Sequence, residues 1–184
     1  MDYSITETET AYRAYAYDLK VAQVRMPSGD TVRREILDHV GAVVAVPLND
    51  AGQVALVRQY RVCTGEYLWE APAGLRDQPG EDPLATARRE LAEETDLRAA
   101  RWDELGAFYT SPGMTDERIH HYLARDLTLV PHGERHARKD EEADMELRWW
   151  DLDKALEAVA AGEIRNGVTA LALQLTYGHL LSSK

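Results

Sequence analysis

The order of strand-like and helix-like segments is the feature that most constrains the fold of this chain. Apolar residues alternate with polar ones over much of the sequence, which is typical of half-buried β-strands. Helical patterns begin only at Pro83, Leu152 and Gly167. Because regular strand–helix–strand alternation and a G-x-G-x-x-G turn are both absent, a doubly wound nucleotide fold is disfavoured. The pattern predicts an α+β or layered α/β protein. The strand-like segments are residues 11–26, 31–40, 41–48, 53–62, 66–74, 101–113, 118–130 and 145–152.

Two turn sequences within this pattern predict β-hairpins. PSG at residues 27–29 separates the first two strand-like segments, and NDAG at residues 49–52 separates the next two. Short Gly-containing and Asn/Asp-containing turns of this kind favour hairpin connections. A boundary is expected near residues 37–41. We therefore predict an N-terminal β-sheet over residues 1–38 and a main domain over residues 39–184.

Charge and composition narrow the class of protein. Of the 184 residues, 45% are hydrophobic and 29% are charged, so the chain is apolar enough to fold around a core. The net charge of −11 argues against nucleic acid or an anionic membrane as a partner, because both require a basic surface. The start lacks signal-peptide features and no long apolar run occurs, so a cytoplasmic protein is expected. The single cysteine, Cys63, lies in an apolar strand pattern and is expected to be buried or half-buried.

The segment RRELAEETDL, residues 88–97, crowds acidic side chains onto one predicted helix. Asp82 is a suitable N-cap and Pro83 a suitable first residue for this helix. With 3.6 residues per turn, one stripe is expected to be buried, and the three glutamates form a band along the flank beside it. The expected stripe is Leu84, Ala87, Leu91 and Thr95, and the flanking acids are Glu90, Glu93 and Glu94.

This acidic band is electrostatically unfavourable without a counter-charge. Facing acids cost about 0.2–0.5 kcal/mol per pair on a solvated helix, and partial burial increases the cost. The acids also lie in the C-terminal half of the helix, where the macrodipole favours cations. One explanation is a solvated charged face neutralised by Arg88 and Arg89. The alternative is a divalent cation such as Mg²⁺, which binds carboxylate oxygens and substrate phosphates together.

The neighbouring residues favour the cation. GLRDQPGEDPLATARRELAEETDL, residues 74–97, resembles the Nudix box, G-x5-E-x7-R-E-U-x-E-E-x-G-U, where U is aliphatic. From Glu81 onward the spacing matches. Six residues instead of five separate Gly74 from Glu81, and Asp96 replaces the last box glycine. Because Asp tolerates positive φ, we expect Asp96 to end the helix in place of that glycine.

The resemblance covers most of the chain and points to one branch of the family. VRQYR, EAPAG, FYTSPGMTDERIHHYLAR and GEIRNGVTALAL are similar to the ADP-ribose pyrophosphatases, and Pro112 matches a marker of that branch. The resemblance implies an α/β/α sandwich on a mixed sheet, preceded by an N-terminal antiparallel sheet that is exchanged within a homodimer. It also implies hydrolysis of ADP-ribose to AMP and ribose 5-phosphate.

The resemblance also suggests roles for individual residues. Glu90, Glu93 and Glu94, with the carbonyl of Ala73, would bind Mg²⁺, or Mn²⁺ as an alternative. Arg89 would orient the glutamates, with Glu81 and Gly74 in support. A general base is expected in DEEAD, residues 140–144: Glu142 is the first choice and Glu141 the second. The alternative for this short motif is an acidic loop tip without a catalytic role.

Three arginines are candidates for binding the substrate: Arg61, Arg58 and Arg76. Arg58 and Arg61 should point to opposite faces of their strand, so at most one is expected to reach the ligand, and surface salt bridges are the alternative for both. GDP-mannose or another nucleotide sugar is the nearest alternative substrate. A sensor that binds ADP-ribose without hydrolysing it is a further alternative, although such a protein would not be expected to retain all the box acids.

Overall fold

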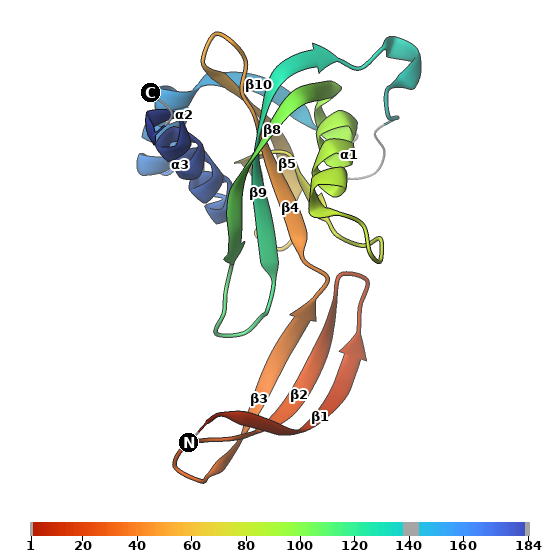
Figure 1. Cartoon of the computed structure of the whole chain (residues 1–184), viewed down its shortest axis with the longest axis vertical. Coiled ribbons are helices and arrows are strands. Elements are labelled where there is room, and N and C mark those ends of the chain that lie inside the picture. The colour runs from red at the N-terminus through yellow and green to blue at the C-terminus, as the bar shows by residue number, and fades with distance from the viewer. Residues whose placement is uncertain (1, 138–143, 183–184) are drawn as a thin grey trace.

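The computed structural model describes residues 2–137 and 144–182. Its N-terminal part is a three-stranded antiparallel sheet in the order β1 (Ser4–Arg13), β2 (Tyr17–Arg25), β3 (Thr31–His39). Figure 1 shows this sheet extending away from the rest of the molecule. The predicted hairpin at residues 27–29 is confirmed, with Gly29 at φ 96° between β2 and β3.

The predicted single strand over residues 11–26 is wrong. The chain turns at residues 14–16, where the Ala14 N–H donates to the Tyr17 carbonyl at 2.9 Å. The strand before this turn is β1, which begins at Ser4. Because the polar–apolar alternation continues through the turn, the sequence pattern did not reveal it.

Two sheets form the main part of the molecule. One has the order β7 (Ala73–Leu75), β4 (Ala42–Pro47), β9 (Arg118–Leu129), β8 (Leu97–Tyr109), and β4 and β9 are parallel within it. The other is antiparallel, in the order β10 (Glu146–Asp151), β5 (Gln53–Arg61), β6 (Glu66–Glu70). A mixed sheet therefore packs with an antiparallel one, as the predicted fold class requires.

The predicted NDAG hairpin is only partly correct. The turn forms, because Asn49 Oδ1 accepts from the Ala51 and Gln53 N–H groups and Gly52 adopts φ 78°. However, a single bridge between Leu48 and Val54 joins the two flanking strands, which then enter different sheets. All six residues of β4 are buried, and this strand takes its partners β7 and β9 from later in the chain.

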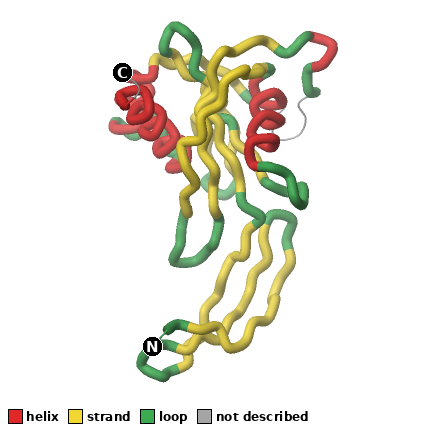
Figure 2. Tube along the Cα trace, viewed as in Figure 1, coloured by secondary structure: helices red, strands yellow, loops and turns green. Residues whose placement is uncertain are grey.

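Helices cover both sides of these sheets. Figure 1 shows α1 (Pro83–Thr95) on one side, and α2 (Leu152–Ala160) and α3 (Gly167–Ser182) on the other. A short 3₁₀ helix, His132–Glu134, follows β9. In Figure 2 the helices flank the strands only in the main part of the molecule. This arrangement is the predicted α/β/α sandwich.

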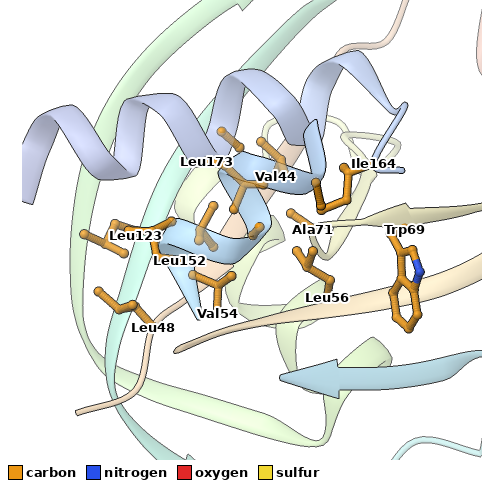
Figure 3. Close-up of a cluster of buried hydrophobic side chains, with 14 of the residues drawn as sticks. Val44, Leu48, Val54, Leu56, Trp69, Ala71, Leu123, Leu152, Ile164 and Leu173 are labelled. Atoms are coloured by element: carbon orange, nitrogen blue, oxygen red, sulfur yellow. The ribbon is translucent and has the colours of Figure 1, made fainter. Parts of the chain in front are cut away.

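The main core lies between the sheets and the α2/α3 layer. Figure 3 shows side chains from β4, β5, β9, α2 and α3 converging there. A smaller cluster, Ala55, Leu91, Leu97 and Ala124, lies under α1. The labelled core residues are Val44, Leu48, Val54, Leu56, Trp69, Ala71, Leu123, Leu152, Ile164 and Leu173.

Two further observations concern the surface. Cys63 is exposed, so the expectation of burial is wrong: β5 ends at Arg61, and Cys63 belongs to the turn that follows. Among the described residues, none of the helices is both long enough and apolar enough to cross a membrane.

Candidate active site

Helix α1 forms where its local signals predict. The Asp82 side chain accepts from the Leu84 N–H at 3.4 Å, and Pro83 is the first helical residue. The helix ends at Asp96, which adopts φ 56° and ψ 27° in the left-handed region and donates its N–H to the Ala92 carbonyl. Asp96 therefore takes the conformation expected of the missing glycine. Ala87, Leu91 and Thr95 are buried as the helical wheel predicts, whereas Leu84 is only partly buried.

The acidic flank of α1 faces strand β7. Glu94 is 5% exposed, and its Oε2 accepts from the Ala73 N–H at 3.1 Å. Gly74 lies directly against Glu90, because a Cβ built on Gly74 would overlap the Glu90 carboxylate. Only glycine leaves room for this carboxylate. The structure therefore brings Ala73 and Gly74 together with two of the three predicted acidic ligands.

Arg89 is the positive charge at the centre of this flank. Its Nη1 donates to Glu90 at 2.6 Å and to Glu93 at 3.3 Å. Its Nη2 lies 3.6 Å from Glu81 and 3.9 Å from Asp77. Burial lowers the pKa of Arg89, but the carboxylates of Glu90, Glu93 and Glu81 together raise it above its ordinary value. Arg89 therefore stays charged and connects the acids of the box.

Glu81 lies in the same region. Its Oε2 accepts from the Thr86 hydroxyl at 2.7 Å, which fixes the carboxylate beside Arg89. Arg88, the other basic residue considered as a neutraliser, is exposed, and its guanidinium lies 6.0 Å from the Trp102 ring centre. Of the two basic residues, Arg89 is the one that contacts the box acids.

Arg61 lines a pocket next to β7. Its guanidinium pairs with Glu70 through two hydrogen bonds, Nε at 3.0 Å and Nη2 at 2.6 Å, and Glu70 is only 2% exposed. Both residues line a cavity of about 280 Å³ that also contacts Ala73, Gly74 and the segment entering α3. The sequence did not reveal the Glu70 contact, although a carboxylate at the end of the apolar strand EYLWE was a signal for it.

The other two arginines take different places. Arg58 lies 3.8 Å from Glu146 and 5.1 Å from the Tyr67 ring centre, and it does not line the pocket of Arg61. This agrees with the expectation that the two arginines occupy opposite faces. Arg76 donates its backbone N–H to Gly41, and its Nε is buried with no hydrogen-bond partner among the described residues.

Three other predicted positions have different outcomes. Pro112 lies in an exposed turn after β8, closed by a hydrogen bond from the Met114 N–H to the Ser111 carbonyl. Glu141 and Glu142 lie outside the described residues. One contact was not anticipated: the Tyr15 hydroxyl, from the turn between β1 and β2, donates to Asp77 beside Arg89.

The chemistry of these side chains suits a hard divalent cation. Glu90, Glu93 and Glu94 offer carboxylate oxygens on one helix flank, and Ala73 offers a carbonyl oxygen nearby. Within residues 2–137 and 144–182, no three acidic, histidine or cysteine side chains already form a metal cluster. Glu90 and Glu93 are instead paired with Arg89, so the donor types fit a cation although the carboxylates are not gathered around one point.

A capped acidic helix against a mixed sheet, with a half-buried arginine among its carboxylates, is typical of a Nudix-type protein. Residues 38–171 match the family model of the NUDIX domain. The chain therefore belongs to the Nudix hydrolase family, whose members generally depend on divalent metal ions.

Several relatives share most of their length with this chain. An ADP-ribose pyrophosphatase from Mycobacterium tuberculosis is 42% identical over 91% of this chain and 79% of the relative. The ADP-ribose pyrophosphatase of Bacillus subtilis is 37% identical over 90% of this chain and 88% of the relative. A GDP-mannose pyrophosphatase from Cronobacter sakazakii is 34% identical over 94% of this chain and 91% of the relative.

The fold also has a close structural counterpart. A crystal structure of an ADP compounds hydrolase superimposes with a TM-score of 0.84, covering 100% of this chain and 96% of the other. Because the two sequences are only 22% identical, this likeness supports the fold alone.

Proposed function

We propose that this protein hydrolyses the pyrophosphate bond of ADP-ribose, giving AMP and ribose 5-phosphate. The observation that carries the proposal is the position of Glu94, buried on the acidic flank of α1 and held by the backbone of β7. A buried carboxylate beside Glu90 is costly unless a cation or its equivalent compensates it. The ADP-ribose pyrophosphatase relatives support this choice of substrate.

The proposed metal ligands are Glu90, Glu93, Glu94 and the Ala73 carbonyl, with Mg²⁺ as the expected ion and Mn²⁺ as an alternative. When bound, the metal would neutralise the pyrophosphate oxygens and assist attack by water. The residues of the chain prepare this site. Ala73 fixes the Glu94 carboxylate, Gly74 leaves space for Glu90, and Arg89 holds Glu90 and Glu93 on the same flank.

The proposed substrate contacts centre on Arg61. Its guanidinium lines the cavity beside Ala73 and Gly74, so it can meet a phosphate placed at the acidic flank. Arg76 follows β7 directly and is the second candidate. Arg58 is the weakest of the three, because it contacts Glu146 and Tyr67 away from this cavity.

Glu142 is proposed as the general base, with Glu141 as the second choice. General-base catalysis contributes about 10²–10⁴-fold to a rate. Glu142→Gln should therefore lower turnover by this order while Mg²⁺ binding is retained. Near-normal turnover would remove Glu142 from the role, and Glu141→Gln would then be tested in the same way.

The deciding experiment incubates the purified protein with Mg²⁺, and in parallel with Mn²⁺, and a panel of substrates. ADP-ribose, GDP-mannose, NADH and diadenosine polyphosphates are compared by following release of AMP or GMP. The proposal expects the highest kcat/KM for ADP-ribose. GMP release at a higher kcat/KM would favour a GDP-mannose hydrolase, as the Cronobacter relative suggests. Binding of ADP-ribose without release of AMP would instead favour a sensor that binds ADP-ribose without hydrolysing it.

A homodimer is proposed for the whole protein, with residues 1–38 as the exchanged sheet and residues 39–184 as the hydrolase domain. The support is a group of exposed large apolar side chains on the N-terminal sheet. The net charge of −11 supports a small-molecule substrate over nucleic acid. The exposed side chains are Tyr3, Ile5, Tyr12, Tyr15 and Tyr17.

A further inference from the structure

The segment EAPAG, residues 70–74, joins β6 to β7 and contacts both Arg61 and the acidic flank of α1. It is called the connector below. At its first residue, Glu70 holds the Arg61 guanidinium. At its end, the Ala73 N–H holds Glu94 and Gly74 lies against Glu90. The relative position of the substrate arginine and the acidic flank therefore depends on five consecutive residues.

Two hydrogen bonds fix the middle of the connector. The Pro72 carbonyl accepts from the Ala45 N–H of β4 at 2.8 Å. The Ala71 N–H donates to the Thr169 hydroxyl of α3 at 2.9 Å, and both residues are 1% exposed. Figure 3 shows Ala71 near Ile164, in the segment that leads into α3. Ala71 and Thr169 are almost fully buried, and a buried backbone N–H requires a hydrogen-bond partner, which the Thr169 hydroxyl provides.

Thr169 is itself held in a fixed position. It lies in the first turn of α3, and its backbone N–H donates to Asn166 Oδ1 at 2.9 Å. Asn166 thus caps the helix, and the rigid first turn presents the Thr169 hydroxyl to the connector. The sequence GEIRNGVTALAL is similar to the family, and its threonine, Thr169, lines the Arg61 cavity while its hydroxyl accepts from the Ala71 N–H of the connector.

We propose that Thr169 is a positioning residue, which acts through the Ala71 N–H to hold Arg61 and Glu94 in register for metal and substrate. This inference rests on the proposed function for the roles of Arg61 and Glu94. It assigns to the C-terminal helix a part in the site that goes beyond covering the sheet. Thr169 also lines the Arg61 cavity, but the proposed effect passes through its hydroxyl to the Ala71 N–H and along the connector, and does not require contact with the ligand.

Thr176 provides a matched control on the same helix. It is 0% exposed, faces the interior like Thr169, and its hydroxyl has no hydrogen-bond partner among the described residues. Thr169→Val and Thr176→Val remove the same hydroxyl and keep almost the same shape. Only the first leaves a buried backbone N–H without its acceptor.

The first test measures Mn²⁺ binding by isothermal titration calorimetry, and kcat and KM for ADP-ribose, on both variants and on Thr169→Ser. Thr169→Val should weaken Mn²⁺ binding and raise KM by about tenfold each, the scale of lost outer-shell support. Thr176→Val should leave both unchanged, and Thr169→Ser should restore both. Mn²⁺ affinity and KM within about twofold of wild type in a folded Thr169→Val protein would overturn the proposal. So would equal impairment in Thr169→Ser.

A second measurement uses the wild-type protein and needs no folded variant. The Ala71 and Ala73 amide protons should exchange slowly, and adding Mg²⁺ should slow both together, because they belong to one fixed segment. Exchange of Ala71 at the rate of an exposed loop amide would overturn the proposal. Neither metal binding nor hydrogen exchange requires ADP-ribose turnover. An inactive wild-type protein with these responses would contradict the proposed function alone.

Discussion

Strand β4 in the sandwich buries all six of its residues, whereas nine of the ten residues of β1 in the N-terminal sheet are exposed. Among residues 2–40, Ala22 is the only buried residue. The sandwich therefore obtains its stability from its own core, while the N-terminal sheet presents apolar side chains that no part of the described chain covers.

The candidate active-site residues that the structure describes also lie in the sandwich and not in the N-terminal sheet. Glu94, Arg89 and Glu70 are held by contacts within the sandwich, so the candidate site is built on its helices and strands. The N-terminal sheet reaches this neighbourhood through two side chains. Tyr15 contacts Asp77, and His39 Nε2 lies 3.6 Å from Glu117, which lines the Arg61 cavity. This difference predicts that changes in the sandwich alter the reaction, whereas changes in the N-terminal sheet alter assembly.

Glu94→Gln should have the largest effect. The amide oxygen can still accept from Ala73, but the negative charge is lost, so we expect activity to fall by at least about 10²-fold and metal binding to weaken. The free energy of unfolding should not fall, because repulsion from Glu90 is relieved. Steady-state kinetics and urea unfolding would check both. The control is Glu157→Gln, in an exposed ion pair on α2. Turnover within about fivefold of wild type would contradict the role of Glu94.

Gly74→Ala should have the next largest effect. The new methyl group would overlap the Glu90 carboxylate, so either β7 or Glu90 must move. Loss of such close support is expected to lower activity by about 10–100-fold. Gly178→Ala is the matched control, because a Cβ there meets open space in α3. It should leave activity unchanged and raise stability by up to about 1 kcal/mol. Equal activities for the two variants would show that Glu90 does not need this space.

Local sequence signals, such as helix caps and turn residues, predicted the parts of the fold that depend on contacts between neighbouring residues. Asp82, Pro83 and Asp96 set the ends of α1 through caps that act within one helical turn. The NDAG turn was also recognised, but turn chemistry does not specify which strands pair. The parallel pairing of β4 with β9 joins residues more than 70 positions apart, such as Ala42 and Ile119, and no local pattern encodes it.

In the candidate site, too, the local contacts were predicted from the sequence and the long-range contacts were not. The box acids and Arg89 were predicted because their spacing in the sequence is also their spacing on the helix. The contact of Glu70 with Arg61 was not predicted, because it joins side chains on two neighbouring strands, β5 and β6. The contact of Thr169 with Ala71 was not predicted, because it joins residues 98 positions apart. The exposure of Cys63 was missed because the end of β5 at Arg61 has no strong breaker before it. Glu142 and Glu141 remain predictions.

The N-terminal sheet offers a prediction about assembly. Ile5 and Tyr12 are 60% and 61% exposed, so replacing both by glutamate should cost little within one chain. If they lie in a dimer interface, two buried charges should raise the dimer dissociation constant by at least about tenfold. Sedimentation equilibrium measures this directly. Val62→Glu, at a 73% exposed position in the sandwich, is the control. An unchanged dissociation constant in the double variant, or a monomeric wild type, would contradict the proposed interface.

The smallest predicted effect concerns the sandwich core: the pH dependence of its stability, which a buried histidine should influence. His121 is 1% exposed and packs edge-on against Phe108, and burial lowers its pKa below the ordinary value of 6.5. The unfolded chain therefore binds a proton that the folded chain resists. Stability should be full above about pH 6.5 and fall as the pH drops below it, by up to about 1.4 kcal/mol per pH unit for this one group.

Urea unfolding between about pH 7 and pH 5 should show a smaller loss of stability in His121→Leu than in the wild type. The exposed His132→Gln should retain the wild-type slope. If both variants keep that slope, acid sensitivity does not arise from this buried ring, and other groups, including His120, whose pKa burial also lowers, must carry it.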